Sequence, residues 1–163
     1  MKQEHRITRS LADESATVEF GHWLGVELMR RYNGRAVVFF EGQLGAGKTT
    51  MVRGLLASLG HSGVVKSPTY TLLEPYNVGM SSVGMKGVGQ HTQEVFHFDL
   101  YRINDPHELE FVGFDEIVDG PGLKLFEWAE RALAWLPEPD VQVSLNAVTT
   151  TEPVSREVSV EFS

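Results

Sequence analysis

The eight residues 42–49, with the sequence GQLGAGKT, constrain the fold more than any other part of the chain. They match G-x-x-x-x-G-K-[ST] at every fixed position. The apolar run 36–40 comes just before them and predicts a buried strand, and the run 48–59 comes just after them and predicts a helix. A glycine-rich turn between a strand and a helix points successive backbone N–H groups at phosphate oxygens. The sequence therefore predicts a P-loop in an α/β domain.

Each fixed residue of this pattern has a separate task. Gly42, Gly45 and Gly47 let the backbone curl around a phosphate. Lys48 supplies a full positive charge for the outer phosphates, and the hydroxyl of Thr49 is a ligand for Mg²⁺. These residues predict the binding of a nucleotide with its magnesium ion.

Size and composition indicate one globular domain. The chain has 163 residues, of which 42% are apolar, and it shows no internal repeat, so we expect a single domain over 1–163. No apolar run approaches 18 residues, and the N-terminus lacks the apolar stretch of a secretory signal. There is no cysteine, which excludes a disulfide scaffold and a thiolate metal site. Together these features favour a cytoplasmic protein with no membrane contact.

The net charge of −8 disfavours direct binding of nucleic acid. Affinity for a phosphate backbone comes mainly from Lys and Arg side chains. If RNA is involved, we expect another protein to supply most of the contact.

Hydrophobic periodicity predicts a mixed sheet flanked by helices, with an antiparallel hairpin at its C-terminal end and at one edge. Expected helices are 13–32, 48–59, a segment from 105 to 113, and 128–136; expected strands are 36–40, 64–65, 95–101, 123–127, 141–145 and 158–162. An extended segment over 67–74 would place Thr69 and Thr71 on one face. The glycine-rich stretch 77–93 is expected to be a flexible loop, either a lid or a tolerated insertion.

Two carboxylates end apolar strands, where open α/β sheets hold their ligands. Glu127 ends the strand LKLFE, and Asp99 lies near the end of VFHFD. We expect Glu127 to serve Mg²⁺ through a bound water and Asp99 to hold that water or orient the attacking one. Either could instead be a solvated strand end. His97 shares a face with Asp99, but we interpret it as a packed core residue without a catalytic role.

Five ordered motifs together resemble the bacterial TsaE family, also called YjeE. They are GQLGAGKTT (42–50), KSPTYTL (66–72), HFDLYR (97–102), DPHELE (105–110) and EW (127–128). The resemblance spans about 13–143. Members of this family are small ATPases needed for the threonylcarbamoyladenosine modification of tRNA.

The resemblance implies ATP and Mg²⁺ as ligands, and TsaD and TsaB as partners. TsaD would carry the transfer reaction, the ATPase would reset the complex between rounds, and tRNA would be reached only through the complex. The residues implied to bind phosphate are Gly45, Ala46, Gly47, Lys48, Thr49 and Thr50, with Lys48 also catalytic.

Further roles are implied by the same motifs. Thr49 and Glu127 would serve the metal, and Asp99 would support hydrolysis. Thr69 or Thr71 would be the threonine that senses the γ-phosphate, and Glu14 would lie near the base.

The sequence departs from the family pattern in two places. Gln43 stands where the family usually has Asp, with a side chain expected to point outward, and the 77–93 stretch is longer than usual.

Two other functions fit a P-loop. A small-molecule or nucleotide kinase fits the size, although the stretch 77–93 lacks an arginine-rich lid. A GTP-driven switch would use the D-x-x-G match at 119–122, but no N-K-x-D stretch is present to read guanine.

Overall fold

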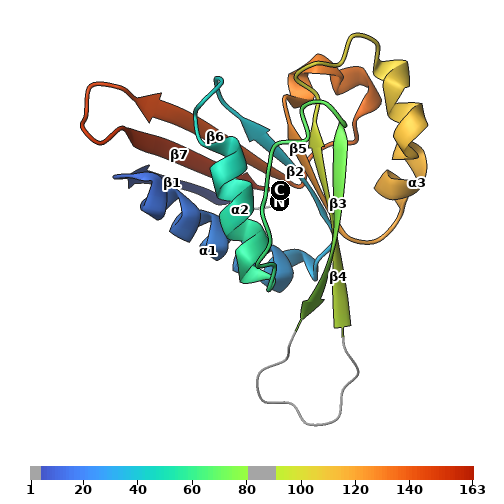
Figure 1. Cartoon of the computed structure of the whole chain (residues 1–163). Helices are drawn as coiled ribbons and strands as arrows, with labels where there is room; N and C mark the ends of the chain where they lie inside the picture. Colours follow the sequence, from blue (N-terminus) through green and yellow to red (C-terminus); the bar gives the residue numbers. More distant parts are fainter. Residues whose placement is uncertain (1–4, 81–90) are drawn as a thin grey trace.

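Seven strands form one mixed sheet (Figure 1). The computed structural model describes residues 5–80 and 91–163. In sheet order the strands are β1 (His5–Leu11), β7 (Ser155–Phe162), β6 (Val141–Val148), β2 (Ala36–Glu41), β5 (Leu123–Glu127), β4 (His91–Asp99) and β3 (Leu73–Met80). Strand β2 runs parallel to β5 and β6, and β5 runs parallel to β4, whereas the outer pairs are antiparallel. The P-loop strand is therefore central, between two parallel neighbours.

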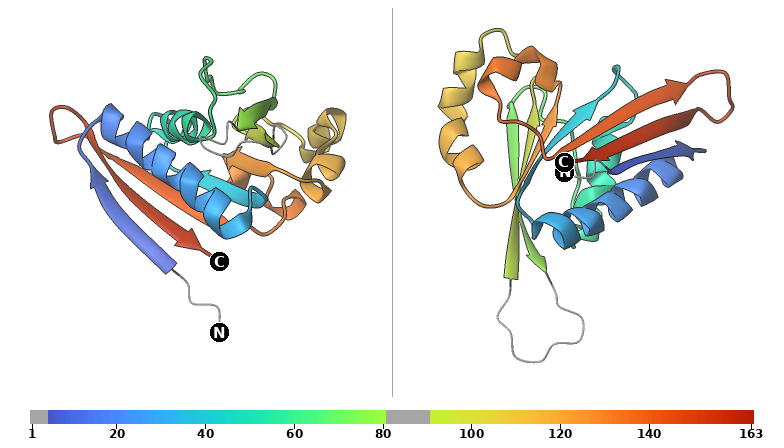
Figure 2. Two further views of the ribbon diagram at one scale, coloured as in Figure 1. Left: turned by 90° about the horizontal axis from the view of Figure 1, so that it is seen from below. Right: turned by 180° about the vertical axis from the view of Figure 1, so that it is seen from behind.

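Helices cover both faces of the sheet (Figure 2). Helices α1 (Glu14–Tyr32) and α2 (Lys48–Ser58) pack on one face, over alternate residues such as Val38 and Phe40 of β2. On the other face, Phe39 and its neighbours pack against η1 (Pro106–Val112), α3 (Phe114–Asp119) and η2 (Ala129–Arg131), and the short η3 (Leu133–Trp135) follows η2. This alternation explains why β2 is apolar on both sides. Within the described residues, no helix has the length and apolarity needed to cross a bilayer.

Glycines bring α1 and α2 into backbone contact. A Cβ atom added to Gly54 would lie 2.1 Å from the carbonyl oxygen of Val18, and one added to Gly21 would lie 2.2 Å from that of Met51. Only glycine fits at such distances. The crossing holds α2, and with it the end of the P-loop, close against α1.

An ion-pair cluster lies on the last turns of α1. Arg30 and Arg31 donate hydrogen bonds of 2.7 and 2.9 Å to Glu27. These bonds lower the pKa of Glu27 to about 2 from its ordinary 4.5. The cluster thus favours the ionised carboxylate in the folded state.

The main expectations from the sequence are confirmed. The fold is α/β with a mixed sheet, β2 and α2 flank the P-loop, and β6 and β7 form the C-terminal hairpin. Asp105 caps η1 in a capping box with Glu108. The single-domain span 1–163 stays a prediction, because 1–4 and 81–90 lie outside the described residues.

Several expectations about local structure are wrong. The hairpin is not at the sheet edge, because the polar strand β1 pairs with β7 and covers it. Residues 77–80 and 91–93 are strand rather than loop, because pairing across β3 and β4 continues through them; the rest of that expected loop lies outside the described residues. Residues 64–65 form no strand. The expected helix 128–136 is two 3₁₀ helices, since Trp128 and Ala132 leave helical backbone angles.

Candidate nucleotide-binding site

The P-loop leaves the carboxyl end of β2 and enters α2 with a left-handed backbone. Gly45 has φ of 79° and Gly47 has φ of 106°, values that other residues rarely adopt. Gly47 is also the N-cap of α2, so the first amides of the helix face the loop. This geometry is the anion cradle that the sequence predicts.

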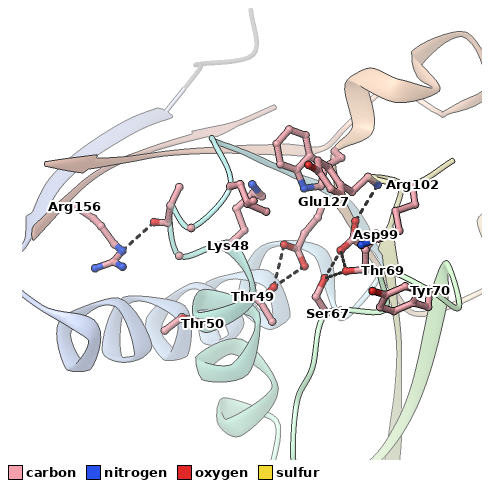
Figure 3. Close-up of a pocket in the computed structure, with 16 residues that line it drawn as sticks. Lys48, Thr49, Thr50, Ser67, Thr69, Tyr70, Asp99, Arg102, Glu127 and Arg156 are labelled. Carbon is pink, nitrogen blue, oxygen red and sulfur yellow. Dashed lines mark hydrogen bonds between the residues drawn. The ribbon is translucent and has the colours of Figure 1, made fainter. Parts of the chain in front are cut away.

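A cavity of about 560 Å³ opens beside this cradle (Figure 3). Its walls come from the P-loop, from the segment after α2, from the ends of β4 and β5, and from β7. The lining residues are Leu44, Gly45, Ala46, Gly47, Lys48, Thr49, Thr50, Ser67, Thr69, Tyr70, Asp99, Tyr101, Arg102, Glu127, Trp128 and Arg156. Parallel strands β4 and β5 place Asp99 directly opposite Glu127 in the sheet register. The cavity therefore lies where open α/β sheets hold their ligands.

Thr49 and Glu127 meet in this cavity. The hydroxyl Oγ1 of Thr49 lies 3.1 Å from each carboxylate oxygen of Glu127, and the carboxylate is almost fully buried. A hydroxyl and a carboxylate are hard oxygen ligands, which suit Mg²⁺. Among residues 5–80 and 91–163, no cluster of three or more His, Asp or Glu could hold a metal by itself. The pair fits an ion that takes its remaining ligands from phosphate and water.

Lys48 is held over the P-loop. Its Nζ donates hydrogen bonds of 2.5 Å to the carbonyl of Gly42 and 3.2 Å to that of Gln43. The same ammonium lies 4.1 Å from the ring centre of Trp128. Burial lowers the pKa of Lys48, and the negative charge of Glu127 partly opposes this effect. A bound phosphate would add a further anion to this partly buried cation.

Asp99 holds the segment that follows α2. The hydroxyls of Ser67 and Thr69 both donate to Oδ2 of Asp99, the latter at 3.0 Å. The backbone N–H of Tyr101 donates to Oδ1 at 2.9 Å. The carboxylate thus fixes the 67–69 segment at the mouth of the cavity.

Comparison with known proteins identifies the family. The family model described as "Threonylcarbamoyl adenosine biosynthesis protein TsaE" matches residues 11–158. The chain belongs to the TsaE family. This confirms the resemblance seen in the five motifs, and it shows a family that takes part in threonylcarbamoyl adenosine biosynthesis.

Individual TsaE proteins match most of the chain. The "tRNA threonylcarbamoyladenosine biosynthesis protein TsaE" of Haemophilus influenzae is 39% identical over 141 residues, which cover 86% of this chain and 82% of that protein. The protein of the same name from Bacillus subtilis is 37% identical over 107 residues, covering 66% and 59%. The crystal structure of Bacillus subtilis YdiB is similar in fold, with a TM-score of 0.70, 23% identity, and coverage of 99% and 88%.

The structure brings most of the expected TsaE site residues to one cavity, but not all. Thr71 is exposed in a turn and does not line it, because residues 69–71 turn instead of running extended. Of the two candidate switch threonines, only Thr69 reaches Asp99. Glu14 is exposed and pairs with Arg53 of α2 at 2.8 Å, outside the cavity lining. The role of Glu14 near the base stays a prediction.

The D-x-x-G match of a GTP-driven switch lies away from this cavity. Residues 119–122 precede β5, whereas the cavity lies beyond the carboxyl end of β5. The carbonyl of Asp119 accepts a hydrogen bond from Arg35, just before β2. This placement gives the motif no contact with the P-loop.

Sequence reasoning missed several residues of the lining. Arg156 of β7 donates from Nε to the carbonyl of Ala46 at 2.9 Å, so it holds the outer side of the P-loop. Arg102 stacks on the ring of Tyr70 at 4.4 Å, at the rim. Arg102 and Tyr70 lie inside recognised motifs, which could have drawn attention to them. Arg156 lies in no motif, and only the strand pairing of β7 reveals it.

Proposed function

We propose that this TsaE-family protein is a Mg²⁺-dependent ATPase that serves threonylcarbamoyladenosine synthesis on tRNA in the cytoplasm, in a complex with TsaD and TsaB. The observation that carries the proposal is the meeting of the Thr49 hydroxyl and the Glu127 carboxylate beside the P-loop. The names of the relatives support the pathway.

The P-loop residues 45–50 would bind the phosphates of ATP. Backbone amides would donate to the phosphate oxygens, and Lys48 would move from its carbonyl partners to the outer phosphates. Thr49 and Glu127 would hold Mg²⁺, the latter through water. When bound, Mg²⁺ neutralises phosphate charge and makes the terminal phosphate a better target for attack.

Asp99 would orient the attacking water. Its carboxylate lies opposite Glu127 in the sheet and already accepts hydrogen bonds from Ser67 and Thr69. Loss of the γ-phosphate would change the partners available to the Thr69 hydroxyl. The 67–69 segment is therefore suited to report the state of the nucleotide.

Partners would complete the site. P-loop enzymes often need a group from another protein to reach full activity. We therefore expect slow turnover by the isolated chain. The net charge of −8 agrees with contact to tRNA through TsaD and TsaB and not by this chain alone.

The test is ATP hydrolysis by the purified chain, alone and with purified TsaD and TsaB. The proposal predicts marked stimulation by the partners, and loss of both hydrolysis and modification in Lys48→Ala. Arg9→Ala, which removes an exposed cation on β1, is the matched control and should behave as wild type. Unchanged modification by folded Lys48→Ala would refute the proposal. Transfer of labelled γ-phosphate to a nucleoside or metabolite would favour a kinase instead.

A further inference from the structure

A buried histidine lies directly behind the Glu127 carboxylate. Its Nε2 is 2.6 Å from Oε2 of Glu127, and the side chains of His97 and Glu127 are 0% and 3% exposed. The other ring nitrogen, Nδ1, is also buried and has no hydrogen-bond partner within the described residues. The hydrogen therefore belongs on Nε2, because a hydrogen on Nδ1 would be a buried donor without an acceptor.

Strand geometry explains why the histidine reaches this carboxylate. Side chains alternate along a strand, so Val95, His97 and Asp99 of β4 share one face. On the neighbouring strand β5, Leu125 and Glu127 point to the same face, since Leu125 and Val95 belong to one core cluster with α1 and α2. One strand thus supplies Asp99 to the cavity and, two positions earlier, His97 to the core side of Glu127.

We propose that His97 is a positioning residue that fixes the Glu127 carboxylate for Mg²⁺. The inference rests on the proposed function, and it assigns a role to a group that does not itself reach the cavity. His97 donates to Glu127 from the core, while Thr49 donates from the cavity side at 3.1 Å. A carboxylate held from both sides keeps one orientation before the metal arrives.

The contact differs from that of a histidine that only fills the core. The single hydrogen-bond partner of His97 within the described part of the chain is this carboxylate, not a backbone carbonyl. When a residue that hydrogen-bonds to a metal ligand is replaced, the affinity for the metal typically falls about 10- to 100-fold. A packing role would instead change stability and leave the metal dependence as it was.

The test compares three variants that separate hydrogen bonding from volume. His97→Gln keeps an N–H donor at the same number of bonds from Cα, His97→Leu removes the donor, and His97→Asn retains polarity but is too short. For each protein, ADP affinity is measured by calorimetry across a Mg²⁺ titration and again in EDTA, together with the melting temperature.

The inference predicts that the half-saturating Mg²⁺ concentration rises about 10- to 100-fold in His97→Leu and His97→Asn. His97→Gln should recover most of the loss, and affinity in EDTA should be unchanged in all three. An unchanged Mg²⁺ requirement in folded His97→Leu or folded His97→Asn would overturn the inference alone. Wild-type ADP binding that is indifferent to Mg²⁺ would overturn the proposed metal role of Glu127 as well.

A measurement on the wild-type chain does not depend on the folding of any variant. Nitrogen-15 NMR of labelled imidazole groups distinguishes a hydrogen on Nε2 from one on Nδ1. The inference predicts the Nε2–H form for His97, and the Nδ1–H form would overturn it.

Discussion

At the glycine contact between α1 and α2, replacing Gly54 by alanine should lower the stability of the fold by an amount that can be estimated. In Gly54→Ala, the new methyl group would lie 2.1 Å from the Val18 carbonyl oxygen, although ordinary contact begins at 3.4 Å, so the two atoms would be 1.3 Å too close. The obstacle is backbone and cannot rotate away as a side chain could. The two helices must therefore separate.

Two opposing terms set the size of the effect. Overpacking of this kind costs about 1–3 kcal/mol, and a backbone clash belongs near the upper end. Alanine regains about 1 kcal/mol of helix propensity over glycine. The net loss is about 2 kcal/mol, which lowers the melting temperature by about 4–8 °C in a chain of this size. Because α2 begins with Lys48 and Thr49, its displacement should also weaken nucleotide binding.

Calorimetric melting of Gly54→Ala tests this reasoning. Ser15→Ala, at an exposed position of α1, is the control and should melt within 2 °C or so of wild type. A melting temperature of Gly54→Ala equal to or above that of wild type would show that the helices do not cross at this distance. Nucleotide affinity measured on the same sample reports whether the P-loop moves with α2.

Three further predictions concern single contacts. Thr49→Val should abolish the Mg²⁺ dependence of ADP affinity and spare binding in EDTA; an unchanged Mg²⁺ titration would argue against the metal role of this hydroxyl. Arg156→Met removes the charged donor of the hydrogen bond to the Ala46 carbonyl, a bond of about 1.5–3 kcal/mol. ADP should therefore bind up to about 10- to 100-fold more weakly. Equal affinity would show that the P-loop keeps its conformation without this bond. The pKa of Glu27 is about 2 when folded and 4.5 ordinarily, so its two arginine partners stabilise the fold above about pH 4.5, and this contribution is lost as the pH falls towards 2. The gap in melting temperature between wild type and Glu27→Gln should therefore close over that range, and a gap independent of pH would refute the assignment.

The P-loop and its two carboxylates could be predicted because their signals are local. Gly42 to Thr49 is a contiguous pattern, and strands that end in Glu127 and Asp99 are apolar enough to recognise. Strand β5 beside β2, and β4 beside β5, are parallel to β2 and bring both carboxylates to the same edge of the sheet. This rule alone, without the order of the strands, predicts that the two carboxylates lie near each other.

The missed features depend on contacts between distant parts of the chain. Arg156 lies 110 positions from Ala46, and only the pairing of β7 beside β6 brings them together. His97 was expected to be packing alone, because the sequence does not show which side of Glu127 it meets. Their glycine-rich surroundings predict a loop for segments 77–80 and 91–93. In the structure both segments are strands, and Val78 is buried opposite Gln93.

The central place of β2 has a consequence for synthesis on the ribosome. The strand that carries the P-loop ends at Glu41, but its first partner, β5, begins 82 positions further along at Leu123, and its second, β6, follows at Val141. At about 5–20 residues per second, β2 waits roughly 4–16 s for β5 to be made. Until then, β2 is an apolar strand without its partner strands in the sheet, and the glycine-rich loop that follows it leaves an unpaired strand. The proposed nucleotide site is therefore completed late, after most of the chain has been translated.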